Sequence, residues 1–448
     1  MKKNKNGLYL LWLMLFLVGS PVGITAQGTT GSLLPCFPGA EGFGATTPGG
    51  RGGRVIKVTN LDAGGPGSFQ AACSAEGPRI VVFDTSGVIE GQVRIDHGRI
   101  TIAGQTAPGA GITIRGRLYS RADSLPLEDI VVRFIRVRPY RAGSDTGDAI
   151  QFNRVRRCVL DHCSCSWSTD EAMGLYEACE TTVQWCAIEE SDTVGHEEKK
   201  YHNAGFLNGP DGHRLSVHHN LFAHHRRRSP AIANGPADVR NNVVYNFRDG
   251  FLHDNPTNDT TFNIIGNYYK RGPNVFNIFP FCFVDSTYYY LRDNYIETVG
   301  LVQDPWAEAY KLDGLRAYAD KGFKAEEPAG VPAVTTHSPL EACRLVLERA
   351  GCLPRDTVSR RTVEEVKNGT GYWGRNDPGD LMAGLTVRPA RADSDGDGMP
   401  DEWEQASGLN PRDGSDHNTV MRSGYTAIEE YCNMLAEKLI FSSAGKKP

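Results

Sequence analysis

Six short segments share one pattern: an apolar residue, two mostly polar residues, and then Cys or Asn. They are Leu160-Asp-His-Cys163, Val183-Gln-Trp-Cys186, Val217-His-His-Asn220, Val239-Arg-Asn-Asn242, Ile264-Ile-Gly-Asn267 and Leu291-Arg-Asp-Asn294, with spacings of 23, 34, 22, 25 and 27 residues. A period of ~20–30 residues with one short β-rich unit is typical of a β-solenoid, in which each coil buries its inward residues against the next. Asn at a matching position in successive coils predicts a ladder of side-chain amides inside the turn.

The segments outside the repeat agree with a solenoid. Residues 79–83, 100–103 and 130–134 are expected to be further short strands. The longest interval, between Cys186 and Asn220, contains an insertion at 195–211, which is expected to form a loop on one face. An open sandwich of irregular strands is the alternative.

Composition excludes several classes of protein. The chain has 448 residues, a formal net charge of −5, 40% hydrophobic and 23% charged residues, so it is not collagen-like, disordered or a multi-span membrane protein. Its 50 glycines and 25 prolines favour a turn-rich β protein over a helical bundle.

The N-terminus is typical of a secretory signal. Lys2, Lys3 and Lys5 precede an apolar run at 8–18 that is short for a membrane span, and cleavage is expected near Ala26. An uncleaved signal anchor is the alternative. Cleavage leaves 45 of the 48 basic residues against 53 acidic ones, so the mature chain carries about −8 and nucleic acid is not an expected partner. We predict a secreted or periplasmic monomer.

The eleven cysteines leave at least one thiol unpaired, and no CxxC…CxxC spacing supports a zinc site. Those in or beside the strand-like runs are expected to be small buried residues; they are Cys158, Cys163, Cys165, Cys179 and Cys186. A disulfide between Cys343 and Cys352 remains open.

The two ends of the solenoid differ from its middle. The glycine-rich stretch at 38–53 lacks the GK[ST] ending of a phosphate loop, so we predict a turn-rich cap over one end. Helices are expected at 339–350, with Ser338 as N-cap and Gly351 behind it, and at 362–367. The predicted parts are a signal at 1–26, a solenoid at 27–300, an extension with helices at 301–390 and a final module at 391–448.

A cluster of cationic side chains, His224-His-Arg-Arg-Arg228, follows the strand that carries Asn220. Such a cluster on an acidic protein predicts an anionic substrate, which Arg228 would contact together with His225, Arg226 and Arg227. A solvated positive face beside a strand end is the alternative.

Acidic residues lie near two coil borders, at Asp148 and at Asp170-Glu171. Stacking would bring them together, and oxygen ligands from neighbouring coils suit a hard cation such as Ca²⁺. Turn capping by Asp is the alternative. Lys199 and Lys200 lie on the insertion, where a lysine is more often merely exposed.

A second calcium motif lies near the C-terminus. Residues 393–404 match D-x-D-x-D-G-x₅-E, which predicts Ca²⁺ ligands at Asp393, Asp395, Asp397, Asp401 and Glu404. Because no amphipathic helix precedes it, the loop resembles the single calcium loops of dockerin-like and thrombospondin-type repeats. We expect a structural role, with a helix from about Thr426.

Motifs spread over residues 36–300 together resemble polysaccharide lyase family 1, the pectate lyases. They are Phe37-Pro-Gly-Ala-Glu-Gly-Phe-Gly44, Val58-Thr-Asn-Leu61, Gly65-Pro-Gly-Ser68, Ile102-Ala-Gly-Gln-Thr-Ala-Pro108, Leu160-Asp-His162, His218-His-Asn220, Arg228-Ser-Pro230 and Arg240-Asn-Asn-Val-Val-Tyr-Asn246. The resemblance implies an all-β, right-handed parallel β-helix that binds polygalacturonate and cleaves it by β-elimination.

The resemblance also implies roles for single residues. The family's catalytic arginine falls on Arg228, its substrate-contacting lysine on Lys199 or on Lys200, and its Ca²⁺-binding acids on Asp148 and Asp170. The chain departs from the family at two positions. Gly174 replaces a second acid, for which Glu171 is a possible substitute, and Ala233 replaces a second arginine.

The implied chemistry starts at C5 of a uronate, whose proton is α to the C6 carboxylate. A cation and a lysine neutralise that carboxylate, and Arg228 removes the proton. Arginine has a pKa above ~12 and is therefore normally protonated. To act as a base it needs a desolvated, cation-rich setting that lowers its pKa, which Arg226, Arg227, Lys199 and Ca²⁺ would supply. A hydrolase needs two carboxylates about the bond, and no Asp-Asp pair is present. A non-catalytic pectin-binding protein, or a lyase for another uronate, is the other alternative.

Overall fold

The computed structural model describes residues 34–121, 125–140, 147–194, 201–257, 260–285, 287–318 and 323–443. From Leu34 onward the chain forms one compact unit. The predicted signal at 1–26, together with Lys199 and Lys200, lies outside the described residues. The domain boundaries expected at 300 and 390 stay predictions.

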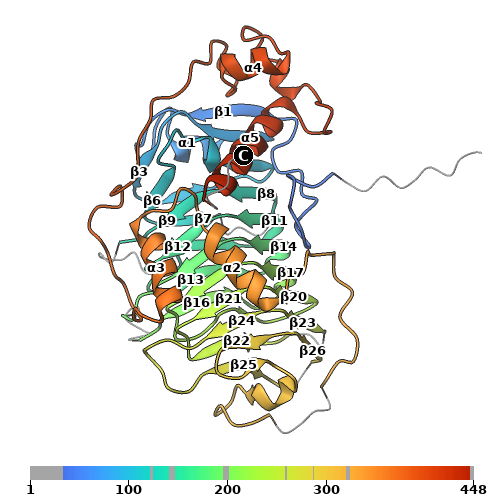
Figure 1. Cartoon of the computed structure of the whole chain (residues 1–448). Helices are drawn as coiled ribbons and strands as arrows, with labels where there is room; N and C mark the ends of the chain where they lie inside the picture. Colours follow the sequence, from blue (N-terminus) through green and yellow to red (C-terminus); the bar gives the residue numbers. More distant parts are fainter. Residues whose placement is uncertain are drawn as a thin grey trace, which may run out of the picture. The chain divides into compact units, whose positions relative to one another are not determined.

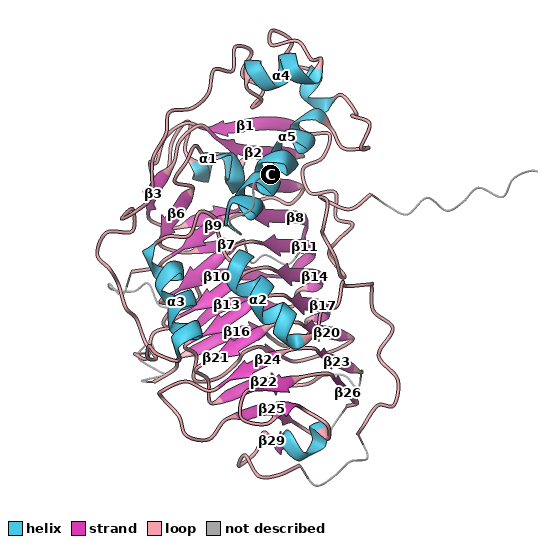
Figure 2. Ribbon diagram, viewed as in Figure 1, coloured by secondary structure: helices cyan, strands magenta, loops and turns pink. Residues whose placement is uncertain are grey.

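Short strands form three long sheets, which we name A, B and C (Figures 1 and 2). Sheet A contains β1 (Arg54–Val58), β2 (Arg79–Phe83), β5 (Ile100–Ala103), β8 (Leu127–Arg133), β11 (Val155–Asp161), β14 (Cys179–Gln184), β17 (His213–His218), β20 (Ala237–Arg240), β23 (Phe262–Ile265) and β26 (Tyr289–Arg292). Sheet B contains β3 (Gly87–Glu90), β6 (Ile112–Arg115), β9 (Ile135–Val137), β12 (Ser164–Ser166), β15 (Ala187–Glu189), β18 (Leu221–Ala223), β21 (Val243–Tyr245), β24 (Tyr268–Lys270), β27 (Tyr295–Ile296) and β28 (Gly300–Leu301). Sheet C contains β4 (Val93–Ile95), β7 (Leu118–Ser120), β10 (Ile150–Asn153), β13 (Glu171–Tyr176), β16 (Ala204–Asn208), β19 (Ala231–Ile232), β22 (Asp249–His253), β25 (Phe279–Phe283) and β29 (Ala309–Lys311).

The chain visits sheets A, B and C in turn, and each strand pairs in parallel with the strand one coil away. In sheet A, for example, Val183 of β14 lies opposite Val217 of β17, which lies opposite Val239 of β20. Only the terminal pair β27–β28 is antiparallel among the described strands. The predicted β-helix is therefore confirmed, and the alternative of an open sandwich is wrong.

The predicted amide ladder fills the corner between sheets A and B. The side-chain oxygen of Asn242 accepts from the side-chain nitrogen of Asn220 at 3.0 Å, and Asn267 and Asn294 continue the ladder with the same spacing. Each oxygen also accepts a backbone N–H from the preceding coil, at 3.0 Å in each case. These contacts satisfy buried polar groups that the corner would otherwise leave without partners.

The residue before each ladder position has a left-handed backbone. His162, Trp185, His219, Asn241 and Asp293 all have φ between 51° and 56°. Repetition of this conformation in register gives the coils from β11 onward the same sharp corner, and it allows rings to stack between coils. The ring centroids of Trp185 and His219, for instance, are 4.4 Å apart.

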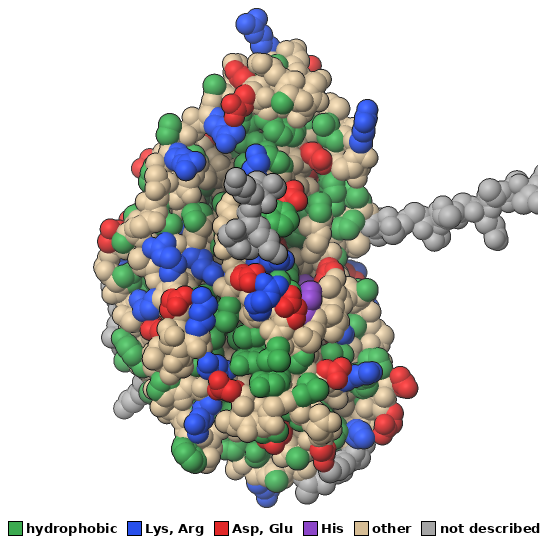
Figure 3. Space-filling view, viewed as in Figure 1, with side chains coloured by type: hydrophobic (Ala, Val, Ile, Leu, Met, Phe, Trp, Pro, Cys, Tyr) green, Lys and Arg blue, Asp and Glu red, His purple; other side chains and the backbone are tan. Residues whose placement is uncertain are grey.

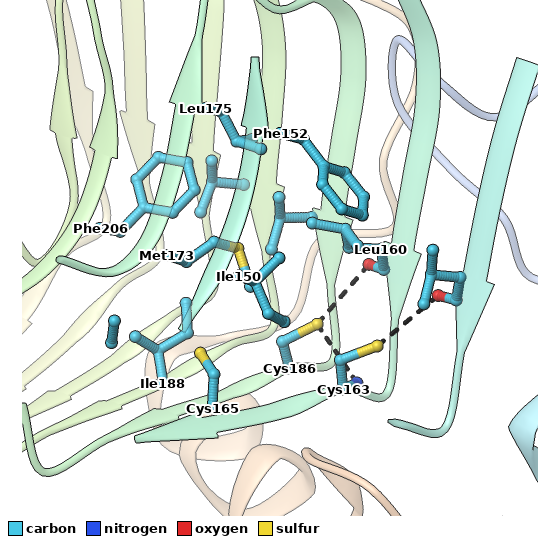
Figure 4. Packing of buried hydrophobic residues seen from close by; sticks show 14 of the residues in the cluster. Ile150, Phe152, Leu160, Cys163, Cys165, Met173, Leu175, Cys186, Ile188 and Phe206 are labelled. Atoms are coloured by element: carbon cyan, nitrogen blue, oxygen red, sulfur yellow. Dashed lines mark hydrogen bonds between the residues drawn. The ribbon is translucent and has the colours of Figure 1, made fainter. Parts of the chain in front are cut away.

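The solenoid interior is apolar and contains five of the eleven cysteines. Cys158, Cys163, Cys165 and Cys186 are fully buried, as predicted, whereas Cys179 is only half-buried. In Figure 4 the sulfurs of Cys163 and Cys186 lie among aliphatic and aromatic side chains and contact backbone carbonyls of the strands. All eleven cysteines are free, so the open possibility of a disulfide between Cys343 and Cys352 is not realised.

The helices lie outside the sheets, except for α1 (Phe69–Ser74), whose Phe69, Ala72 and Cys73 join the interior near the first coils. Helices α2 (Pro339–Arg349) and α3 (Thr357–Asn368) cover sheet B, where their apolar residues contact Ala187, Leu221 and Val243 (Figure 2). The helix predicted at 339–350 is confirmed. The helix predicted at 362–367 begins earlier, because Asp356 caps it by accepting from the backbone of Ser359.

The glycine-rich opening is not the end cap that we expected. It lies along the outer face of sheet A, where Gly44 and Gly50 donate their N–H groups to the hydroxyls of Thr182 and Thr101. A Cβ on Gly44 would come within 2.2 Å of the Cys158 carbonyl oxygen, and a Cβ on Gly50 within 1.8 Å of the Arg79 carbonyl oxygen. The glycines are therefore needed for close approach to the sheet.

The C-terminal module closes over the first coils. It contains α4 (Asp401–Ser407) and α5 (Ala427–Ser443), and the start of α5 confirms the helix expected from Thr426. Met399, Ile428 and Tyr431 pack on Ile80 and Val82 of sheet A. The short 3₁₀ helices are η1 (Gly104–Thr106), η2 (Pro305–Glu308) and η3 (Asp416–Asn418).

None of the helices in the described part of the chain combines the length and the apolar character needed to cross a bilayer. On the face covered by α2 and α3, acidic and basic side chains are interspersed (Figure 3). This face therefore presents no broad surface of one charge to a charged polymer.

Candidate active site and cation sites

The candidate site lies at the corner that leads from sheet B into sheet C. Asp148 precedes β10, Asp170 precedes β13, His202 precedes β16 and Arg228 precedes β19. Glu171, the first residue of β13, lies opposite Ala204 of β16 in the parallel register. Stacking of the coils therefore brings together side chains from distant parts of the sequence.

Two of the predicted carboxylates are almost completely buried. Asp148 is 2% exposed and Glu171 is 1% exposed. One carboxylate oxygen of Asp148 accepts the backbone N–H of Glu171 at 3.0 Å, and the other has no hydrogen-bond partner. Burial raises the pKa of Asp148 well above its ordinary value, and the nearby charges of Glu171 and Asp170 add to the effect.

His202 lies between the other two acidic groups. Its Nε2 is 2.9 Å from Oδ1 of Asp170 and 3.0 Å from Oε1 of Glu171. Burial lowers the pKa of His202, but its hydrogen bonds to both carboxylates outweigh burial and raise the pKa. Burial likewise opposes ionisation of Glu171, yet contacts with His202 and Arg228 lower its pKa.

The guanidinium of Arg228 bridges two carboxylates. Nη1 contacts Oε1 of Glu171, and Nη2 is 3.1 Å from Oδ2 of Asp254, which follows β22. Burial lowers the pKa of Arg228, but Glu171 and Asp254 outweigh burial and raise the pKa. The cation-rich setting that we expect to lower the pKa of Arg228 includes Ca²⁺ and Lys199, which lie outside the described structure, so that expectation stays a prediction.

The other members of the cationic cluster differ in accessibility. Arg226 is partly exposed, with its guanidinium 5.4 Å from the ring centroid of Tyr201. The Arg227 side chain is 33% exposed, and burial together with the charge of Arg228 lowers its pKa. His225 is fully buried, and its nitrogens contact the hydroxyl of Ser191 and the carbonyl of Ile188, both at 2.8 Å. The prediction that His225 contacts substrate is therefore wrong, because its ring is fully buried and both of its nitrogens are engaged within the protein.

Among the described residues, Asp170 and Glu171 belong with His202 to a group of ligand atoms close enough to hold one metal ion, and Asp148 lies beside this group. Oδ2 of Asp148 is buried and has no hydrogen-bond partner, and a buried polar atom of this kind needs an explanation. Asp148 also occupies the space beside Gly174, where a Cβ would be 1.8 Å from its Oδ2. The missing acid at position 174 therefore leaves room for the carboxylate of Asp148.

The C-terminal loop brings together a second set of carboxylates. Asp393, Asp395 and Asp397 form one group close enough to hold a single ion, and Asp397 forms another with Glu404 and Asp416. Glu404 is fully buried, and neither of its carboxylate oxygens has a hydrogen-bond partner. Burial and neighbouring aspartates raise the pKa of Glu404 to about 7, and the oxygen ligands of these groups are of the kind that Ca²⁺ prefers.

The predicted ligand Asp401 lies outside both carboxylate groups, so its role as a ligand stays a prediction. Its two oxygens accept the backbone N–H and the hydroxyl of Ser394, both at 2.7 Å, and it belongs to neither carboxylate group of the described residues. Asp416, from the 3₁₀ turn η3, adds a carboxylate that the sequence motif does not contain. The side chain of Lys57 in β1 contacts Asp393 at 2.8 Å and thereby links the loop to the first coil.

Sequence reasoning missed His202, Asp254 and Asp416. The first two occupy coil corners whose lengths vary, so no repeat marks them. The only available signal was a polar residue next to a buried strand. Asp416 lies outside the 393–404 motif and reaches the loop only through folding of the module.

Fold and site together define a parallel β-helix protein with an arginine beside a carboxylate cluster on one sheet. No protein-family model matches the chain. The probable pectate lyase C of Aspergillus fumigatus is 35% identical over 441 residues, which covers 92% of this chain and 97% of that protein. The probable pectate lyase C of Aspergillus terreus is 34% identical over 431 residues, with coverage of 90% and 94%.

These identities over nearly the whole length show that the chain belongs to the pectate lyase family, and it is accordingly an enzyme of the polysaccharide lyase class. Among solved structures, the major allergen of cedar pollen has a TM-score of 0.46 at 16% identity, over 70% of this chain and 93% of its own. That likeness is too distant to support a further conclusion.

Proposed function

We propose that this enzyme cleaves polygalacturonate by Ca²⁺-assisted β-elimination and leaves 4,5-unsaturated oligogalacturonides. The observation that carries the proposal is the convergence of Arg228 with Asp148 and with the adjacent Asp170 and Glu171, which together come from three coils. The names of the relatives support pectate as the substrate.

Binding of a uronate polymer needs positive charge beside the reaction centre. Arg226 and Arg227 are partly exposed next to Arg228, and Lys199 or Lys200 is proposed to contact the reacting carboxylate. Asp148, Asp170 and Glu171 would hold the cation. When bound, such an ion neutralises the C6 carboxylate and makes the C5 proton more acidic.

Arg228 is the proposed base. It accepts the C5 proton, the electron pair of the C5–H bond forms the C4–C5 double bond, and the glycosidic oxygen leaves C4 with its bonding pair. The base must be neutral, whereas the Glu171 and Asp254 carboxylates favour the charged form of Arg228. We therefore interpret the observed arrangement as a resting one, in which Arg228 approaches substrate only after Glu171 releases it.

The test is the ultraviolet absorbance of polygalacturonate during incubation with the purified protein, with Ca²⁺ and with chelator. β-Elimination creates a double bond conjugated to the carboxylate, which hydrolysis does not. Absorbance should grow only with the cation, and Arg228→Ala should lower the rate by about 10²–10⁴-fold, as expected for loss of a general base. Arg214→Ala, on the exposed face of sheet A, is the matched control and should retain the rate.

The other outcomes separate the alternatives. New reducing ends without absorbance would identify a hydrolase. Binding without either signal would identify a non-catalytic pectin-binding protein, which the locked Arg228 and the absence of arginine at Ala233 favour. Activity on a different uronate polymer alone would change the substrate. We further propose export through residues 1–26, to the periplasm or the medium, and action as a monomer without nucleic acid.

A further inference from the structure

The position of His202 bears on which ion the site binds. Its imidazole Nε2 is within 3.0 Å of both Asp170 and Glu171, and its side chain is only 11% exposed. These three residues form a group whose ligand atoms all lie within 4.8 Å of one another. His202 is thus placed as a potential nitrogen ligand beside these two carboxylates, in addition to Asp148, which the proposed function assigns to the same cation.

A further ligand cannot come from position 174. A Cβ at Gly174 would be 1.8 Å from Oδ2 and 2.9 Å from Cγ of Asp148. Asp148 is held there by the backbone N–H of Glu171, while its Oδ2 stays buried and unpartnered. The chain therefore replaces the absent acid from a different coil, with a nitrogen donor in place of an oxygen.

We propose that His202 is a further ligand of the active-site cation, so that the site that the proposed function assigns to Ca²⁺ also accepts Mn²⁺, Co²⁺ or Ni²⁺ and binds these ions more tightly. Ca²⁺ is bound almost entirely by oxygen, whereas imidazole suits divalent first-row transition metals. The spacings of 2.9 and 3.0 Å also match the ~3 Å between neighbouring ligands of an octahedral ion with bonds of about 2.1 Å. The inference rests on the proposed function for the purpose of the site, and ion binding can be tested without it.

Glu171 must then exchange partners. Its Oε1 contacts both His202 and Arg228 in this structure, and an ion at that oxygen would displace the positively charged guanidinium. Arg228 would keep its contact with Asp254 at 3.1 Å. Ion binding by His202 and Glu171 therefore agrees with release of Arg228 toward substrate.

The C-terminal loop provides an internal comparison, because its groups contain carboxylates alone. The nearby His417 has both nitrogens engaged, with the Gly414 carbonyl and the Asn418 amide, each at 2.8 Å. We expect this loop to keep the ordinary preference for Ca²⁺.

The experiment uses the purified full chain in excess Ca²⁺, which fills the C-terminal loop, and titrates Mn²⁺ followed by electron paramagnetic resonance. One Mn²⁺ should bind per chain, and its pulsed spectrum should show ¹⁴N modulation from a coordinated imidazole. His202→Gln should remove the modulation and weaken Mn²⁺ binding by about tenfold or more, as loss of a ligand does. His417→Gln is the matched control and should change neither.

Three results would overturn the proposal. The first is Mn²⁺ bound to the unaltered protein without ¹⁴N modulation, and the second is modulation that persists in His202→Gln. The third is that Ca²⁺ displaces Mn²⁺ equally well from the unaltered protein and from His202→Gln. The first needs no variant, so it holds even if His202→Gln folds poorly. Failure of the proposed function is a separate result, namely Mn²⁺ bound through nitrogen with no unsaturated product from polygalacturonate under any ion.

Discussion

Gly174→Ala adds one methyl group at a site that the structure shows to be full. The new Cβ would lie 1.8 Å from Oδ2 of Asp148, whereas carbon and oxygen normally approach no closer than about 3.4 Å. The carboxyl group must therefore move by roughly 1.5 Å, and it would lose its 3.0 Å hydrogen bond from the Glu171 backbone. We expect the free energy of unfolding to fall by about 1–3 kcal/mol, the usual range for overpacking.

Urea unfolding followed by circular dichroism measures this loss. In an Asp148→Ala background the obstructing carboxyl is gone, so Gly174→Ala should be nearly neutral and the two changes should couple by about 1–3 kcal/mol. Gly64→Ala is the control, since nothing lies within 4 Å of its added Cβ. The reasoning would be refuted if Gly174→Ala left the free energy of unfolding unchanged, or if the losses from Gly174→Ala and Asp148→Ala were additive in the double variant. By the same steric argument, Gly174→Asp should not increase activity.

Three further outcomes are expected. Asp254→Asn removes a charged partner of Arg228, so kcat should fall by about tenfold to a hundredfold through misplacement of the base; a change confined to KM would contradict this. Asn242→Ala breaks contacts with both neighbouring coils, so it should lower the urea midpoint more than Asn294→Ala, at the end of the ladder; equal losses would argue against a cooperative ladder. In metal-free buffer with chelator, the free energy of unfolding should fall as pH rises from about 4.5 to about 7, because burial raises the pKa of Glu404 to about 7 and ionisation then favours the unfolded chain. Ca²⁺ should remove this fall. A free energy of unfolding that rises with pH in chelator would count against the buried acid.

Much of the fold could be predicted because one corner repeats faithfully. Asn220, Asn242, Asn267 and Asn294 occupy identical positions, and the same physical demand, satisfaction of buried backbone groups, recurs in each coil. Because each of these coils has the same buried backbone groups to satisfy, the same residue, Asn, recurs at the same position, and this repeat is visible in a single sequence.

The site was harder to predict because its residues meet only through stacking. The acids and Arg228 were visible as charged residues at strand ends, but nothing local indicated that Arg228 would pair with Glu171 and Asp254. His225 illustrates the opposite error. It belongs to a run of cationic residues, yet the direction of its side chain depends on a corner whose backbone the sequence pattern does not specify.

The glycine-rich opening was misplaced for a related reason. Its composition indicates close contact or tight turns, but it does not say with which surface the contact is made. The hydroxyls that accept hydrogen bonds from this segment belong to Thr101 and Thr182, on strands that follow it at a distance along the chain.

The corners of the coil have separate tasks, and this has a consequence for how such an enzyme changes over time. From β11 onward, the corner between sheets A and B keeps a fixed pair of residues, such as Asn241 and Asn242, and so holds these coils in step. The corner between sheets B and C varies from residues 167–170 in one coil to 190–203 in the next, and it carries the acids, His202 and Arg228. Insertions, deletions and exchanges of chemistry can therefore accumulate at one corner without shifting the register of any sheet. The molecule can acquire a new substrate or ion while its scaffold is inherited unchanged.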